Sequence, residues 1–116
     1  MRLYAVVVVD YGTEVRVYPI TILQYHIVIN DVVAGNLYSI AYSPVSGIYR
    51  VFSGQVKNEK LIFGHTGNLY KNTDLLVDFQ NDTLWSIESG QALVGVMAGA
   101  PLDMIDLKIM NYASAI

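Results

Sequence analysis

The chain has 116 residues, a length that fits one domain and can bury a hydrophobic core without disulfide bonds. Hydrophobic residues make up 53% of the chain and charged residues 15%, a balance that excludes a disordered protein. The net charge is −3 and the positive charges are scattered, which argues against nucleic-acid binding. Cysteine is absent, which excludes disulfides, thiolate metal ligands and cysteine nucleophiles.

The N-terminal run predicts a strand and not a targeting or membrane segment. Residues 1–10 contain one positive charge and a short series of β-branched residues. A secretory signal has a longer apolar region and a cleavage site of small residues. No apolar stretch in the chain reaches the length of a membrane span. We therefore expect a cytoplasmic protein with a single domain over residues 1–116.

The first part of the chain predicts a hairpin and a helix. Residues 3–9 form an apolar run typical of a buried strand, and residues 14–18 alternate with the period of a strand. Gly12 lies between them and can adopt a positive φ angle, so we expect a β-hairpin. Pro19 then favours the first turn of a short helix near residues 19–26. The β-branched residues of that segment leave a strand as the alternative.

The rest of the chain predicts many short strands separated by turns. Asn30 with Asp31, and also residues 34–36, are expected to form turns. Further strands are predicted over residues 37–42, 48–52, 60–63, 75–79, 83–87, 92–98 and 105–109. Roughly eight to ten short strands predict an all-β, mainly antiparallel fold, either a small barrel or a sandwich.

His26 is the first candidate for chemistry. A histidine can act as a general base or a ligand when a neighbouring polar side chain orients its ring, and Asn30 and Asp31 follow it closely. The alternative is a histidine that is hydrogen-bonded at the edge of the core. We favour this structural interpretation of His26 taken alone.

Ser43 and Ser46 lie on either side of Pro44. A nucleophilic serine needs a base within hydrogen-bonding reach and donors for an oxyanion, which the backbone near Gly47 could supply. The same residues are ordinary turn formers, and they do not match the Gly-x-Ser-x-Gly pattern of hydrolases. The sequence therefore favours a turn over a nucleophile.

A short segment with two glycines, Gly64-His65-Thr66-Gly67, could bring backbone close to a ligand or to another strand. It lacks the spacing and the lysine of a phosphate-binding loop. We favour a tight turn with an exposed His65.

The sequence gives little sign of a metal site. The two histidines together with Asp31, Asp74 and Asp78 have no spacing that is diagnostic of metal ligands. We therefore predict no metal and no cofactor. A single tryptophan in a β domain, Trp85 in this chain, is usually part of the core, although it could also line a pocket.

Five segments, taken in order, resemble a known family. They read VYP, HIVIND, YSPVSG, FGHTGNLYKNTDLLVDF and TLWSI, and they span residues 17–87. They are similar to the bacterial and archaeal family called domain of unknown function 3179. The pattern of that family reads roughly AYP, HEIVND, YCPLCG or YCPLTG, FGVSGLLYNSDLLMYDR and SLWSQ. The resemblance extends from about residue 14 to residue 102 and implies a short, cysteine-free member.

The departures from the family pattern concern the residues on which chemistry would depend. Ile27 stands where the family has a glutamate, and Ser43 stands where it has a cysteine. The C-terminal extension of the family is also missing. A hydroxyl does not reproduce thiolate chemistry. The resemblance therefore implies a fold and a pocket, and it weakens an enzymatic interpretation of this chain.

We predict a ligand-binding or structural interaction module without catalytic residues, in which loops at one end of the β domain build a pocket. Its partner is an unknown small ligand, or further copies of itself in a homo-oligomer. The predicted pocket residues are His26, Asn30, Asp31, Tyr42, Ser43, Ser46, Gly47, Gly64, His65, Thr66, Gly67, Tyr70, Asp78 and Trp85. The alternative is a hydrolase-like or metal-dependent enzyme that uses His26 and Asp31 with Ser43 or Ser46.

Overall fold

The computed structural model describes residues 2–114, and the side chains of residues 4–111. This part of the chain contains thirteen strands and one short helix. In chain order they are β1 (Arg2–Asp10), β2 (Val15–Pro19), α1 (Ile20–His26), β3 (Val28–Val33), β4 (Asn36–Ser43), β5 (Ile48–Ser53), β6 (Gln55–Val56), β7 (Glu59–Lys60), β8 (Phe63–Tyr70), β9 (Thr73–Asp78), β10 (Leu84–Ser86), β11 (Ala92–Val94), β12 (Met104–Ile105) and β13 (Lys108–Ser114). Within these residues, no helix has the length and apolar character needed to cross a membrane.

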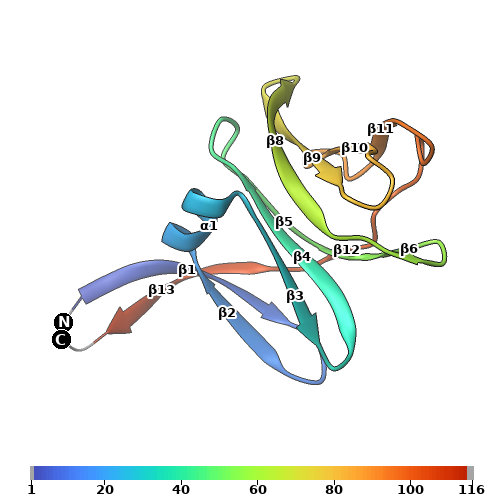
Figure 1. The fold of residues 1–116 in the computed structure, drawn as a ribbon. Helices are drawn as coiled ribbons and strands as arrows, with labels where there is room; N and C mark the ends of the chain where they lie inside the picture. The colour runs from blue at the N-terminus through green and yellow to red at the C-terminus, as the bar shows by residue number, and fades with distance from the viewer. Residues whose placement is uncertain (1, 115–116) are drawn as a thin grey trace.

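The strands form three main antiparallel sheets and a small two-stranded ladder (Figure 1). The strand orders are β13-β1-β2, β12-β5-β4-β3 and β11-β10-β9-β8, with β6 paired to β7. The all-β, mainly antiparallel fold is thus confirmed. The sheets are open, and no closed barrel is detected among residues 2–114. The number of strands exceeds the prediction because several strands have only two or three residues.

The sheet β12-β5-β4-β3 lies between the other two main sheets (Figure 1). Successive residues of a strand face opposite sides of a sheet. Ile40 of β4 packs in a cluster with Val7 of β1 and Leu23 of α1. Its neighbour Ala41 packs in a second cluster with Phe63 and other residues of the sheet β11-β10-β9-β8. Both faces of β4 are therefore buried, and each face contributes to a separate core.

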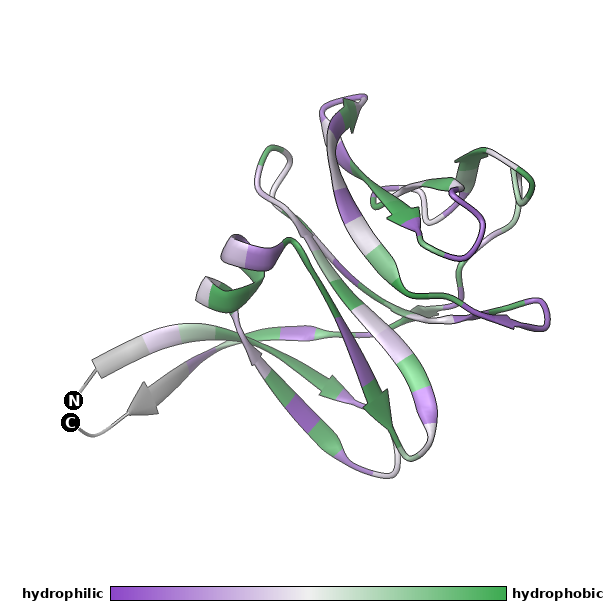
Figure 2. Cartoon of the chain, viewed as in Figure 1, coloured by the Kyte–Doolittle hydropathy of each residue, from purple (hydrophilic) through white to green (hydrophobic). Residues whose placement is uncertain are grey.

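The predicted hairpin and helix are confirmed. The strands β1 and β2 pair from Val6↔Pro19 to Asp10↔Val15, and β2 alternates between hydrophobic and hydrophilic residues (Figure 2). The helix α1 begins directly after Pro19 and ends at His26. The backbone N–H of the next residue, Ile27, donates to the carbonyl oxygen of Leu23 at 2.7 Å. Ile27 has a φ of 68°, a left-handed conformation that is costly for a β-branched residue.

The predicted turn at Asn30 and Asp31 is wrong. Both residues lie in the middle of β3, which pairs with β4 from Val28↔Ala41 to Val33↔Asn36. Their polar side chains form hydrogen bonds with neighbouring strands, and this compensates for their low strand propensity. The turn lies at Ala34 and Gly35, within the predicted residues 34–36, and Asn36 begins β4.

Other boundaries differ from those predicted. The segment around Gly64 is part of the long strand β8 and not a tight turn, although its pairing with β9 is irregular between His65 and Leu69. Only Ala92–Val94 of the predicted strand 92–98 is extended. The last strand, β13, runs five residues beyond the predicted end at residue 109, because it pairs with β1 along its whole length.

Candidate functional site

Two residues of the predicted pocket, Ser43 and His65, meet at the buried carboxylate of Asp74. Asp74 of β9 accepts a hydrogen bond from the hydroxyl of Ser43 in β4, with 2.6 Å between Ser43 Oγ and Asp74 Oδ2. Its other oxygen, Oδ1, lies 2.8 Å from Nε2 of His65 in β8. The backbone N–H of Asp74 also donates to Ser43 Oγ at 3.1 Å. Two sheets are thereby connected through one carboxylate.

The strand pattern explains why these three residues meet. Ser43 lies two residues after Ala41, so both side chains face the sheet β11-β10-β9-β8. His65 pairs with Leu76 in the ladder of β8 and β9, two positions from Asp74. Their side chains therefore lie on one face of that ladder, which the end of β4 covers.

Burial limits what this arrangement can do chemically. Ser43 is fully buried and its hydroxyl donates to Asp74, so it is not placed as an accessible nucleophile. In a hydrolytic triad the histidine lies between the serine and the carboxylate, whereas here the carboxylate lies in the middle. The side chain of His65 is 31% exposed and that of Asp74 is 6% exposed. The imidazole is thus the part of the cluster that reaches the surface.

His26 is not oriented by Asp31, contrary to the alternative interpretation as an enzyme. His26 is the last residue of α1, where it is exposed and makes an edge contact with the ring of Tyr25. Asp31 lies in β3 and bonds to Arg16 and Tyr18 of β2 instead. The left-handed residue Ile27 ends the helix and starts β3, so the two side chains belong to elements with different directions.

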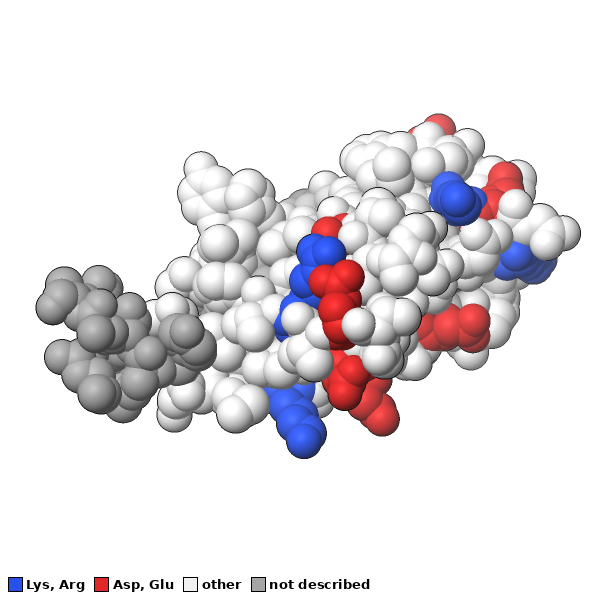
Figure 3. All heavy atoms as spheres, turned by 90° about the horizontal axis from the view of Figure 1, so that it is seen from below, with Lys and Arg blue, Asp and Glu red and all other residues white. Residues whose placement is uncertain are grey.

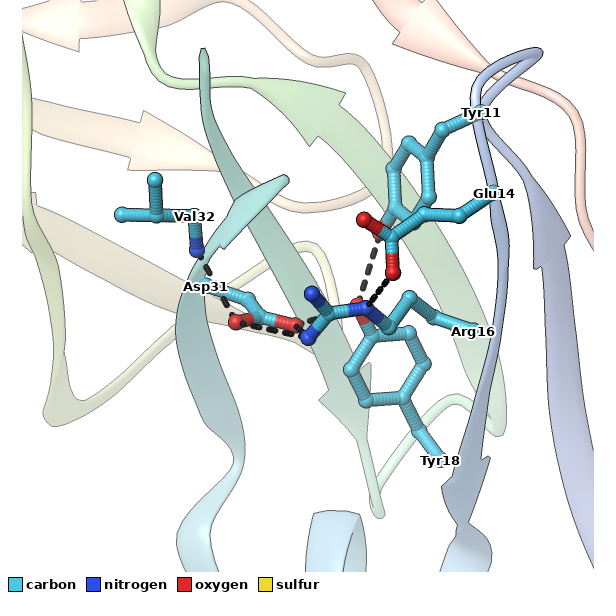
Figure 4. A network of polar contacts seen from close by, with 6 residues as sticks. All are labelled: Tyr11, Glu14, Arg16, Tyr18, Asp31 and Val32. Carbon is cyan, nitrogen blue, oxygen red and sulfur yellow. Dashed lines mark hydrogen bonds and ion pairs between the residues drawn. The ribbon is translucent and has the colours of Figure 1, made fainter. Parts of the chain in front are cut away.

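Asp31 is the centre of a network that connects β2 to β3 (Figure 4). Its Oδ2 accepts hydrogen bonds from the hydroxyl of Tyr18 at 2.8 Å and from Nη1 of Arg16 at 3.1 Å. The hydroxyls of Tyr11 and Tyr18 are 2.9 Å apart, and Nε of Arg16 donates to Glu14 at 2.6 Å. Burial, followed by the hydrogen bonds to Tyr11 and Asp31, raises the pKa of Tyr18 far above its ordinary value. The neutral phenol is therefore the stable form.

Asn30 has a structural contact that resembles strand pairing. Its Nδ2 donates to the carbonyl oxygen of Phe63 at 2.9 Å, and its Oδ1 accepts from the backbone N–H of Phe63 at 3.0 Å. The hydroxyl of Ser39 donates to the same Oδ1 at 2.8 Å. The polar atoms of the side chain are thus engaged between β3 and β8.

The predicted pocket residues Asp78 and Trp85 lie in the core. Trp85 is fully buried, as the composition favoured, and its Nε1 donates to Oδ2 of Asp78 at 2.8 Å. Asp78 Oδ1 accepts from the backbone N–H of Asn81 at 2.6 Å and so holds the turn after β9. These two residues are not accessible to a ligand in this arrangement.

The remaining predicted pocket residues are spread over several turns and strands. Tyr42 is buried and stacks on Tyr49, with 4.5 Å between the ring centroids. Ser46 and Gly47 lie in the turn after Ser43, as the sequence favoured. Tyr70 is exposed at the tip of the hairpin of β8 and β9.

The two glycines of β8 have different structural roles. A Cβ atom on Gly64 would lie 2.4 Å from the ring of Phe79, so this glycine permits close packing. Gly67 has a φ of 79°, and Thr66 next to it donates to the carbonyl oxygen of Leu75. Both glycines and Thr66 therefore have structural explanations.

A protein-family model matches residues 4–115, nearly the whole chain, and its description reads "Protein of unknown function (DUF3179)". The chain belongs to the DUF3179 family. No curated protein and no solved structure matches this chain. The resemblance seen in the five sequence segments is thereby confirmed.

The cavities described for this DUF3179 domain lie away from the carboxylate cluster. They have volumes of about 660, 270 and 380 Å³. The first two lie on β1, β2 and β13, and the third lies on β5, β12 and the segment that follows. His26, Ser43 and His65 line none of the three. Among the described residues, no group of three histidine, aspartate or glutamate side chains is arranged to hold a metal ion.

Sequence reasoning missed the central role of Asp74 and the contribution of β2. Asp74 was considered only as one of several metal ligands, because nothing in the sequence places it beside Ser43. A signal did exist for β2, since Arg16 and Tyr18 are two residues apart in an alternating strand and must share a face. Their partner Asp31 was assigned to a turn, so the network could not be inferred.

Proposed function

We propose that this DUF3179 domain is a structural module that associates with further copies of itself. The outer face of the sheet β13-β1-β2 carries the proposal. The register places Val15, Val17 and Met110 on this face, because they pair with Asp10, Val8 and Val6 of β1. Val15, Val17 and Met110 are 57%, 48% and 51% exposed. The opposite face of the same sheet packs in the core through Val7 and Val9.

The shape and charge of this face support association. Val8, Val15 and Met110 line the hollow of about 660 Å³, whose charged residues are Asp10, Asp106 and Lys108. Val6 and Val17 line the neighbouring hollow of about 270 Å³. In the view from below, charged side chains of both signs gather in a band and most of the remaining surface is uncharged (Figure 3). Exposed apolar side chains with charged residues beside them are typical of interaction sites.

The polar residues of the predicted pocket also support a structural role. Ser43, Asn30 and Asp78 are all engaged in internal hydrogen bonds that connect strands or hold a turn. An enzyme would need some of these groups free to contact a substrate. Their engagement favours a scaffold over a catalytic site.

Sedimentation of the purified domain over a wide range of concentration tests the proposal. We expect concentration-dependent association that Val17→Lys weakens by at least about tenfold, because a buried lysine loses hydration and repels its copy. Val96→Lys is the matched control, since Val96 is 82% exposed and lies outside this sheet. A chain that stays monomeric at every concentration would contradict the proposal.

A second candidate function is the binding of a small ligand at His65. Nε2 of His65 lies 2.8 Å from Oδ1 of Asp74, which leaves Nδ1 as the ring nitrogen outside this contact. A primary amide can both donate and accept a hydrogen bond, so it matches this ring nitrogen. Titration with acetamide, followed by the ring resonances of His65, should then show a saturable shift. If acetamide shifts the backbone resonances of the His65→Gln variant as much as those of the wild type, the ligand does not bind at the imidazole.

A further inference from the structure

We infer that the outer edge of β13 pairs antiparallel with β13 of a second copy and joins two three-stranded sheets into one sheet of six strands. This inference rests on the proposed self-association and adds the edge of β13 to the outer face of the sheet as a second contact surface. In the order β13-β1-β2, β13 pairs only with β1 among the residues that the structure describes. The N–H and C=O groups on its other side are therefore available to a further strand.

The edge of β13 is long and regular. The strand has seven residues and pairs with β1 continuously from Arg2↔Ser114 to Val8↔Lys108, without a bulge. It contains no proline and no glycine, and its one charged residue, Lys108, lies at its start. Natural sheets usually protect an edge with charges, proline, a bulge or a covering segment. Within the part of the chain that the structure describes, none of these devices interrupts β13 after Lys108.

The other outer strands of the main sheets are short, irregular or connected to neighbouring elements. The strand β3 is connected to β8 by the two bonds of Asn30 to Phe63. The strand β8 has irregular pairing after His65, and β2 ends at Pro19, where α1 begins. The strands β11 and β12 have three and two residues. Within the described chain, β13 is thus the outer strand best suited to pairing.

The exposed side chains of β13 favour a two-sided contact. Ile109 and Met110 are 53% and 51% exposed. As consecutive residues of a strand they face opposite sides of the sheet. Pairing of two copies would therefore cover an isoleucine from each copy on one face and a methionine from each copy on the other.

The single charge of β13, on Lys108, favours antiparallel over parallel pairing of two copies of the strand. A parallel pair would align the two Lys108 side chains. An antiparallel pair of this length separates them by about 20 Å, given a rise of about 3.4 Å per residue. That separation exceeds the screening length of about 8–10 Å in physiological salt. Two copies of this edge can therefore pair about a two-fold axis without repulsion between their lysines. Such pairing gives a closed dimer and not a filament.

The absence of cysteine allows a direct test by cross-linking. Asn111 is exposed and is the middle residue of β13, so an antiparallel pair along the whole strand places two copies of Asn111 opposite each other. Directly opposed residues have Cα atoms about 4.5–5.5 Å apart, a distance that a disulfide can bridge. We expect Asn111→Cys to form a covalent dimer under mild oxidation. Tyr25→Cys is the control, because Tyr25 is 84% exposed on α1. An equal yield of dimer from both variants would overturn the inference.

Sedimentation of Ile109→Lys separates this inference from the proposed function. We expect it to weaken association at least tenfold while the far-ultraviolet spectrum stays unchanged, because the side chain is already half exposed. Association that persists in Ile109→Lys but is lost in Val17→Lys would overturn pairing through β13 and leave self-association standing. A wild-type chain that never associates would overturn both.

Discussion

Ser43 and Asp74 form two hydrogen bonds with each other across two sheets. The hydroxyl of Ser43 donates to the carboxylate at 2.6 Å and accepts from the backbone N–H of Asp74 at 3.1 Å. Both residues are buried, with relative exposures of 0% and 4%. At Ser43 the sequence favoured a turn over a nucleophile, and the structure has a connection between strands there.

Replacement of Ser43 by alanine should destabilise the domain by about 2–3 kcal/mol. The variant leaves a buried carboxylate oxygen and a buried N–H group without their partner, and such groups cost about 1–3 kcal/mol each when unsatisfied. Urea unfolding measures the difference. Ser46→Ala is the control, because Ser46 is exposed, and it should change stability by less than about 0.5 kcal/mol. Equal stability of the two variants would show that the pair contributes nothing.

Asn30→Asp tests the connection between β3 and β8. The substitution keeps the shape of the side chain but removes the donor to the carbonyl oxygen of Phe63. We expect a loss of about 2 kcal/mol, because a carboxylate oxygen would then face that carbonyl oxygen. Thermal unfolding measures the loss. Asn36→Asp serves as the control, since its one side-chain bond is long, 3.5 Å, and exposed. A melting temperature equal to that of the wild type would contradict the structural role of Asn30.

Ala34→Asn should stabilise the domain by about 0.5–1 kcal/mol. Ala34 and Gly35 connect β3 to β4 and have φ angles of 50° and 80°. Two positive φ values in a two-residue hairpin loop favour Asn-Gly over Ala-Gly, because asparagine tolerates the left-handed conformation better. Denaturant unfolding should show a higher midpoint with an unchanged slope. A lower midpoint would mean that the loop has another conformation.

The raised pKa of Tyr18 predicts a loss of stability in alkaline solution. In the unfolded chain, a tyrosine has a pKa of about 10 and loses its phenolic proton above that pH. In the folded state, the raised pKa of Tyr18 keeps the proton bound above pH 10. The unfolded state then binds fewer protons than the folded state, so stability is complete below about pH 10 and declines above it. Burial also raises the pKa values of Tyr11 and Tyr49, which adds to the decline.

Tyr18→Phe should make this alkaline decline less steep, although it lowers stability at neutral pH through the lost bond to Asp31. Urea unfolding at a series of pH values measures both effects. Tyr25→Phe is the control, since Tyr25 is exposed. If the two variants have the same pH dependence, Tyr18 does not control the decline.

The sequence determined the class of fold, the first hairpin, the helix, the strands β4 and β5 and the family. These features depend on local patterns. Alternation identifies β2, proline marks the start of α1, and residues 43–47 are turn formers whatever surrounds them. The five ordered segments indicated the family for the same reason, because they are read along the chain.

The tertiary structure alone decided which side chains meet. Asn30 and Asp31 have the composition of a turn, yet as neighbours in a strand they face opposite sheets, one bonded to Phe63 and the other to Arg16 and Tyr18. Ser43, His65 and Asp74 come together only because both faces of β4 are covered. No local pattern encodes the order of strands in a sheet or the packing of one sheet on another, since these depend on burial summed over the whole chain.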